Sequence, residues 1–228
     1  VSNTLTLLTA DEWRKATVGM GGSTFDKNGN TDWQKEILQT AFSHSHLVSI
    51  GGNSGPISFR GSLGYLKQEG ILIGSSKEVI SSRIVANQKS LNNKFTATYA
   101  INTSVINRDF LPDQYSTSQA RTEGTRTFMF PQWYLPVWPV YNPDGSYFLP
   151  PSNTINPVWI LKEVYNKQRE NFFQTAVKAD YEIITDLKIG VLGSLTRAND
   201  VFDRFWPTDP QGNGTPEASK SNFNKQIY

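Results

Sequence analysis

The sequence predicts an all-β fold, made of the antiparallel strands of a transmembrane β-barrel with two short helices near the N-terminus. Three observations support this prediction. Apolar and polar residues alternate with a period of two in segments of about ten residues, the length that crosses a bilayer at a tilt. The connections alternate between short turns and long loops, as in outer-membrane barrels. No run of about twenty apolar residues predicts a membrane helix.

The two helices are predicted ahead of the first strand. Thr9 and Glu12 form a capping-box pattern, which predicts a short helix from about Ala10 to Ala16. A glycine-rich break follows. A second short helix, capped within Thr31–Asp32, is predicted to end near Thr40, where the period of the apolar residues changes to two.

Alternation predicts six strands in three hairpins. Tyr65, Tyr99 and Tyr181 fall near the ends of apolar faces, where an aromatic girdle meets lipid headgroups. The predicted strands are His46–Gly51, Ile57–Leu66, Ile80–Gln88, Lys94–Ser104, Phe173–Tyr181 and Leu187–Leu195.

The connections support the barrel as much as the strands do. The short ones, Gly52–Pro56, Lys89–Asn93 and Ile183–Asp186, are rich in turn-forming residues. The long ones are predicted at Lys67–Val79, at about 105–170 and at 197–228. A compact soluble domain seldom contains a structureless loop of about sixty residues. We therefore expect short periplasmic turns and long extracellular loops.

A soluble carbohydrate-binding β-sandwich is the alternative, because its strands also alternate and its core also uses aromatic residues. The net charge of +2, with scattered basic residues, gives no reason to expect a nucleic-acid partner. The absence of cysteine excludes disulfides and cysteine-based catalysis. The sequence also lacks a nucleophile elbow, a zincin motif and a P-loop, so we expect no enzyme and no cofactor.

Several segments resemble the SusC/RagA family of TonB-dependent receptors, and they cover nearly the whole chain in order. They are Leu8–Arg14, Asn30–Ile37, Thr40–Gly52, Gly61–Gly70 and Pro139–Tyr147. The resemblance implies a 22-stranded plugged barrel in the cell outer membrane, of which this chain is a fragment. It implies that residues 1–43 are the end of the plug and its passage to the barrel, and that residues 44–228 are the first six barrel strands.

The resemblance also implies a function and partners. The function is TonB-dependent active import of a nutrient, either an oligosaccharide or a peptide. The implied partners are the rest of the barrel and plug, a SusD-like surface lipoprotein, the TonB–ExbB–ExbD system, the substrate and the lipid bilayer. An open sheet would leave unpaired backbone groups in lipid, so six strands need others to complete the barrel.

Two sets of residues are candidates for binding. A proline-rich loop concentrates aromatic side chains, which stack on sugars or pack on a partner such as the SusD-like lid, or instead form the loop's own core. These candidates are Trp133, Tyr134, Trp138, Tyr141, Tyr147 and Trp159. Charged residues on the polar side of the strands are expected to face the lumen, and they are Arg60, Arg83, Lys178, Asp180 and Lys188.

Metal binding has weak support. Oxygen-bearing side chains alternate at Asp26, Asn28, Asn30 and Asp32, but the glycine and the closing glutamate of an EF-hand loop are missing. A polar turn between two helices is the simpler interpretation. His44 and His46 share a face of any strand, but two ligands without a third are weak evidence for a metal site.

Overall fold

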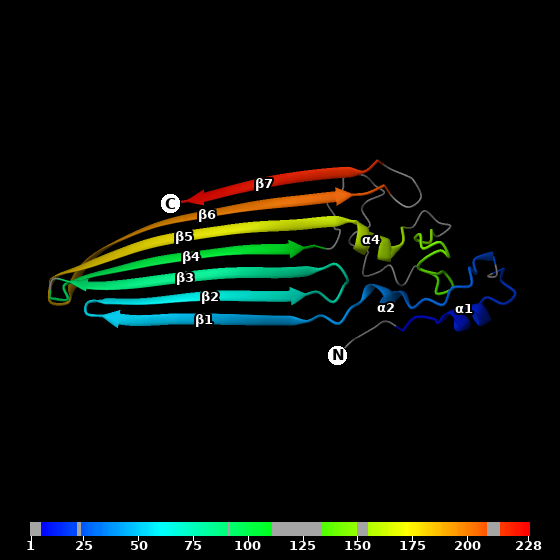
Figure 1. The fold of residues 1–228 in the computed structure, drawn as a ribbon, viewed down its shortest axis with the longest axis horizontal. Coiled ribbons are helices and arrows are strands. Elements are labelled where there is room, and N and C mark those ends of the chain that lie inside the picture. The colour runs from blue at the N-terminus through cyan, green and yellow to red at the C-terminus, as the bar shows by residue number, and fades with distance from the viewer. Residues whose placement is uncertain (1–5, 22–23, 91, 111–133, 150–154, 209–214) are drawn as a thin grey trace.

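The computed structural model describes residues 6–21, 24–90, 92–110, 134–149, 155–208 and 215–228. In these residues one antiparallel sheet runs in sequence order from β1 to β7, and the helices lie at one end of it (Figure 1). The elements are α1 (Ala10–Ala16), α2 (Trp33–Ile37), β1 (Ser43–Ser54), β2 (Ile57–Glu69), β3 (Ser76–Ser90), β4 (Phe95–Asp109), α4 (Pro157–Glu163), β5 (Tyr165–Ile184), β6 (Leu187–Trp206) and β7 (Glu217–Ile227).

The caps explain where the helices begin. The capping box of α1 is present: the Thr9 hydroxyl accepts from the Glu12 amide, and the Glu12 carboxylate accepts from the Thr9 amide. Asp32 caps α2 by accepting from two backbone amides. Asn156 caps α4, which starts with Pro157. Among the described helices, none is long and apolar enough to cross a membrane.

The six predicted strands lie within β1 to β6, except that Lys94 precedes β4 by one residue, and the predicted alternation is confirmed there. The three long loop predictions are wrong in part. The range Lys67–Val79 holds the end of β2 and the start of β3, so that only residues 70–75 connect them. The range 197–228 holds the second half of β6 and all of β7, and the range 105–170 holds the end of β4, α4 and the start of β5. β7 escaped prediction because neither of its faces is apolar, so that pairing with β6 rather than a side-chain pattern defines it. The second half of β6 places the apolar residues Val201 and Phe202 side by side among charged ones, which breaks the period of two. α4 is a short apolar run, whose pattern does not separate a helix from a strand.

The three short turns lie together at one end of the sheet, at the left of Figure 1. They use residues that tolerate the left-handed backbone conformation. Gly55 has φ 56°, Asn92 and Asn93 have φ 53° and 69°, and Asp186 has φ 65°. We name this end the turn end, and the opposite one the loop end.

A small hydrophobic core lies at the loop end. We call the described residues of 6–42, 134–149 and 155–164 the cap, because they share this core. Trp206 of β6 and Leu72 of the β2–β3 connection join the cap to the sheet. The buried members are Ala10, Trp33, Ile37, Leu72, Tyr134, Val137, Trp138, Val140, Val158, Trp159, Ile160, Leu161, Val164 and Trp206.

Backbone hydrogen bonds hold the two chain segments of the cap together. The amides of Lys27 and Gly29 donate to the Val137 carbonyl at 3.2 and 2.9 Å, and the Thr31 amide donates to Pro136 at 2.9 Å. A Cβ on Gly29 would lie 2.4 Å from the Trp138 carbonyl carbon, so only glycine fits this approach. The assignment of residues 1–43 to the end of a plug stays a prediction.

The β-sandwich alternative requires two sheets stacked face to face. All the strands in the described residues belong to one sheet, and neither of its faces is covered by a second sheet. The all-β class and the single antiparallel sheet agree with the predicted barrel wall.

Candidate functional site

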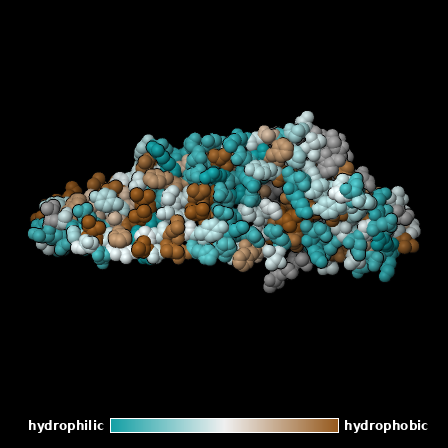
Figure 2. Space-filling model, viewed as in Figure 1, coloured by the Kyte–Doolittle hydropathy of each residue, from teal (hydrophilic) through white to brown (hydrophobic). Residues whose placement is uncertain are grey.

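The pairing register gives the sheet two chemically different faces. Directly opposite residues share a face, and one such row joins Phe59, Ala86, Tyr99 and Val177. We call the face that carries this row the apolar face. Phe59, Tyr99 and Val177 are 47%, 45% and 44% exposed, far more than a soluble core would allow. Figure 2 shows brown apolar side chains standing out toward the turn end, whereas teal dominates the loop end.

The apolar face does not extend over the full length of the strands. Toward the loop end its rows change to Lys67, Glu78, Asn107 and Arg169. The strands from β3 to β6 have 15 to 20 residues, more than the 9 to 11 that a tilted crossing needs. The sheet therefore extends beyond its apolar belt on the loop side.

The opposite face, which we call the polar face, carries all five charged residues predicted to face the lumen. Lys178 pairs with Asp180 at 3.0 Å, and Lys188 pairs with Glu182 at 3.5 Å, both near the turn end. Arg60 and Arg83 form no hydrogen bond or ion pair within the described residues. These two cations are therefore available to a ligand or to another part of the protein.

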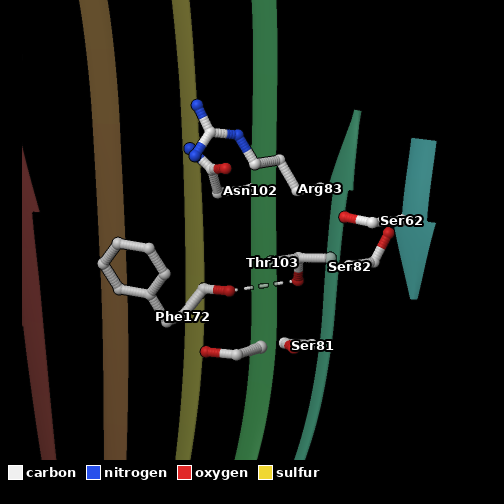
Figure 3. Close-up of a pocket in the computed structure, with 8 residues that line it drawn as sticks. Ser62, Ser81, Ser82, Arg83, Asn102, Thr103 and Phe172 are labelled. Carbon is white, nitrogen blue, oxygen red and sulfur yellow. Dashed lines mark hydrogen bonds between the residues drawn. The ribbon is translucent and has the colours of Figure 1, made fainter. Parts of the chain in front are cut away.

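A shallow hollow surrounds Arg83 on the polar face (Figure 3). Its volume is about 210 Å³. Ser62, Arg83 and Asn102 belong to one cross-strand row of the polar face. Thr103 stands opposite Phe173 on the apolar side, and its hydroxyl donates to the Phe172 carbonyl at 3.0 Å. The lining residues are Ser62, Ser81, Ser82, Arg83, Asn102, Thr103, Ser104 and Phe172. Hydroxyls, an amide and one guanidinium fit a ligand rich in hydrogen-bonding oxygen atoms.

The aromatic candidates separate into buried and accessible ones. Tyr134, Trp138 and Trp159 are buried in the cap core, so their rings pack on protein. The Trp138 indole donates to the Phe25 carbonyl at 2.9 Å, and the Tyr134 hydroxyl donates to the Ile155 carbonyl. This burial agrees with the interpretation of the aromatics as the loop's own core. Trp133 lies outside the described residues.

Tyr141 and Tyr147 lie at the edge of the cap, with ring centroids 5.2 Å apart. Lys162 donates to the Tyr141 hydroxyl at 3.0 Å, and the Tyr147 hydroxyl donates to Glu163 at 2.8 Å. Burial, followed by this bond to Glu163, raises the pKa of Tyr147 above its usual value. The pair is the accessible part of the predicted aromatic surface, and Tyr141 is 40% exposed.

The weak metal candidates have other roles. The Asp26 carboxylate accepts from the Arg14 guanidinium at 2.7 and 3.2 Å, and this lowers the pKa of Asp26. Asp32 caps α2, so its carboxylate is also engaged. No cluster of three or more metal-ligating side chains occurs among the residues that the structure describes. Asn28 and Asn30, the other two candidates, are exposed.

The two histidines lie at the loop-side border of the apolar face. Nδ1 of His44 and Nε2 of His46 are 3.1 Å apart, and both rings contact the ring of Tyr65. Together they form an aromatic border of the kind expected where a membrane-spanning sheet leaves the hydrocarbon.

Two structural residues were missed by the sequence analysis. Arg14 joins α1 to the following loop through Asp26 and the Gly29 carbonyl. Asn156 is fully buried and bonds to the amide of Val158 and the carbonyls of Val140 and Phe148. The Asn-Pro sequence ahead of a short apolar run was the available signal for Asn156.

No protein-family model matches the chain. Among curated proteins, it is 26% identical over 216 residues to TonB-dependent receptor P3 of Formosa agariphila, covering 91% of this chain and 21% of the relative. It is 27% identical over 213 residues to TonB-dependent receptor SusC of Bacteroides thetaiotaomicron, covering 80% and 20%. The chain thus spans about a fifth of the length of these relatives.

Solved structures agree on the fold. The RagAB peptide importer in its open-open state matches with a TM-score of 0.65 and 17% identity, over 88% of this chain and 22% of that one. A structure of the RagAB peptide transporter matches with a TM-score of 0.64 and 18% identity, over 89% and 24%. The resemblance to SusC/RagA-type TonB-dependent receptors is confirmed, and the sheet is part of an outer-membrane β-barrel.

Proposed function

We propose that this SusC-like segment of an outer-membrane barrel takes part in TonB-dependent active import of a nutrient, an oligosaccharide or a peptide. One observation carries the proposal: a single sheet exposes an apolar face and a polar face over the same strands. Such a sheet suits a wall between lipid and a water-filled lumen. The similarity to proteins named as TonB-dependent receptors supplies the transport class.

The sheet needs further strands to complete a barrel. In lipid, the open edges of β1 and β7 would each leave unpaired amides and carbonyls, which cost several kcal/mol apiece. We propose that strands outside this chain pair with both edges and close a barrel of 22 strands around a plug. The short turns then lie in the periplasm, and the loop end of the sheet faces the outside of the cell.

The partners follow from the same comparison. A SusD-like surface lipoprotein would cover the loop end, and the TonB–ExbB–ExbD system would rearrange the plug from the periplasm. The relatives named here are receptors and importers, and we propose no enzymatic activity for this chain.

Two surfaces are proposed to contact the substrate. Tyr141 and Tyr147 offer an accessible aromatic pair at the outside, which suits a sugar ring or an apolar side chain. The hollow around Arg83 offers hydroxyl, amide and guanidinium donors inside the lumen. A substrate would meet these surfaces in that order.

The experiment is import by the full-length transporter in its own cells. Deletion of the gene should abolish growth on the substrate, and complementation should restore it only where TonB is present. Arg83→Gln should raise the substrate concentration needed for half-maximal uptake. Exposed Lys27→Gln, which lies in the cap away from the hollow, is the matched control. TonB-independent uptake by the complemented strain would overturn the proposal.

A further inference from the structure

Two arginines lie on the apolar face where its apolar belt ends. In β5, Val177 and Phe173 belong to the belt. Asn171 and then Arg169 follow on the same face toward the loop end. Arg197 of β6 stands directly opposite Phe173 in the register. Since directly paired residues share a face, both guanidiniums project from the side of the sheet that carries the exposed apolar residues.

These two arginines are unpaired, although neighbouring cations are not. Arg169 and Arg197 are exposed and form no hydrogen bond or ion pair within the described part of the chain. By contrast, Lys167 pairs with Asp109 at 3.4 Å, and Lys220 pairs with Asp203 at 3.3 Å. The carboxylates that share this part of the face on β4 and β6 are therefore already neutralised.

The side chains around the arginines add hydrogen-bond donors. The Asn199 amide donates to the side-chain carbonyls of Asn222 and Asn224 at 2.6 Å each. Both of those amide groups keep their own NH2 donors for other partners. Glu78 is the carboxylate in the Arg169 row, but it lies two strands away on β3. The surface between β5 and β7 is thus rich in donors and positively charged.

We propose that Arg169 and Arg197 bind the phosphates of an anionic lipid headgroup in the outer leaflet, with the acyl chains of that lipid lying on the adjacent apolar belt. The inference rests on the proposed function, since it requires the apolar face to meet lipid. Guanidinium binds phosphate bidentately, and a long side chain lets the charge reach the headgroup level. Four residues of strand separate the two positions, roughly 14 Å, so a headgroup with two phosphates spans both.

The test uses the full-length transporter in nanodiscs and diphosphorylated lipid A as the probe, with the same lipid stripped of phosphate as its counterpart. Wild type should bind the diphosphorylated lipid in preference to the stripped one. The double variant Arg169→Gln/Arg197→Gln should raise the Kd for the diphosphorylated lipid at least about tenfold, because charged hydrogen bonds are lost. Its Kd for the stripped lipid should not change.

A matched control removes the same charge from the other face of the sheet, on β6 and its neighbour β7. Arg204→Gln/Lys225→Gln lies on the polar face of β6 and β7 and should leave the lipid Kd unchanged. Equal weakening by both double variants, or none by the first, would overturn the proposal. Displacement of the lipid by millimolar inorganic phosphate would also overturn it, by showing a simple anion site.

Nutrient import in the same cells separates this inference from the proposed function. Import without any preference for the phosphorylated lipid would overturn the lipid site and leave the transport function intact. A preserved lipid preference in a protein that imports nothing would support the lipid site and count against the transport function.

Discussion

Ala97 and Thr98 are neighbours in β4, yet they lie on opposite faces of the sheet. Ala97 is paired with Gln88 and Ala179 on the apolar face and is covered by its neighbours. Thr98 lies on the polar face and donates to the Asn87 side chain at 2.9 Å. At the scale of one residue, the environment that a side chain meets changes completely between adjacent positions.

Arginine at these two positions should therefore have unequal effects. Ala97→Arg places a charge within the apolar belt, at a position that its neighbours cover, and should lower the free energy of unfolding by about 2–4 kcal/mol. Thr98→Arg faces the polar side and should cost about 1 kcal/mol, the value of one lost hydrogen bond. Urea unfolding of the full-length barrel from lipid vesicles measures both. Equal losses would contradict the assignment of the faces.

Asp26 should make the cap sensitive to acid. Its pKa is lowered in the folded state, chiefly by the hydrogen bond from Arg14, so this contribution to stability is complete above the unfolded pKa. It is lost as the pH falls through the lower folded value. Tryptophan fluorescence of the cap between pH 6 and pH 2 should therefore show a transition in the acid range. Asp26→Asn should remove that transition and leave a cap that is weaker at neutral pH. An unchanged transition in this variant would exclude Asp26 as its cause.

At the scale of elements, the sequence predicted those helices and strands whose formation depends on nearby residues. The capping box predicted α1, and alternation predicted the membrane-spanning parts of β1 to β6. β7 could not be predicted, because Ala218, Ser221 and Asn224 give neither face an apolar character. Its strand conformation comes from pairing with β6, which is a long-range cause. The short apolar run of α4 fits a buried strand or helix equally well by pattern.

Asn156, the N-cap residue of α4, allows a test of how much one side chain stabilises this helix. Asn156→Ala should weaken the cap region by about 1–3 kcal/mol, because it removes the N-cap bond and leaves buried carbonyls with fewer partners. Hydrogen exchange should accelerate in residues 155–164 while the sheet stays protected. Exposed Asn30→Ala is the control, and it should leave the exchange unchanged. Equal acceleration in both variants would mean that Asn156 has no special role.

At the scale of the whole molecule, the two faces and the two ends define an orientation. The alternation predicted which charged residues share a face, as the register of Arg60, Arg83 and Lys188 shows. The contents of the cap were not predictable, because the ion pair between Arg14 and Asp26 depends on how the glycine-rich segment between them folds back. Aromatic composition likewise cannot separate a buried Trp138 from an accessible Tyr141.

Cysteine labelling tests the orientation, and the chain contains no native cysteine to interfere. Ser54→Cys lies at the turn end, and Ser146→Cys lies in the part of the cap that follows β4. On intact cells, a membrane-impermeant maleimide should label Ser146→Cys and should label Ser54→Cys only after the outer membrane is opened. The reverse pattern would invert the orientation.

The strand order has a consequence for how such a sheet assembles. Every strand pairs with its predecessor, so each new strand finds its partner without searching among distant segments. The long connection between β4 and β5 is the exception. Closing residues 110–164 costs roughly 2 kcal/mol more than closing a four-residue turn, because the entropy of loop closure grows only with the logarithm of length. The buried cap core offsets that amount. Folding can thus proceed strand by strand between neighbours in the sequence, and the slow step should be the pairing of β4 with β5 across the long connection.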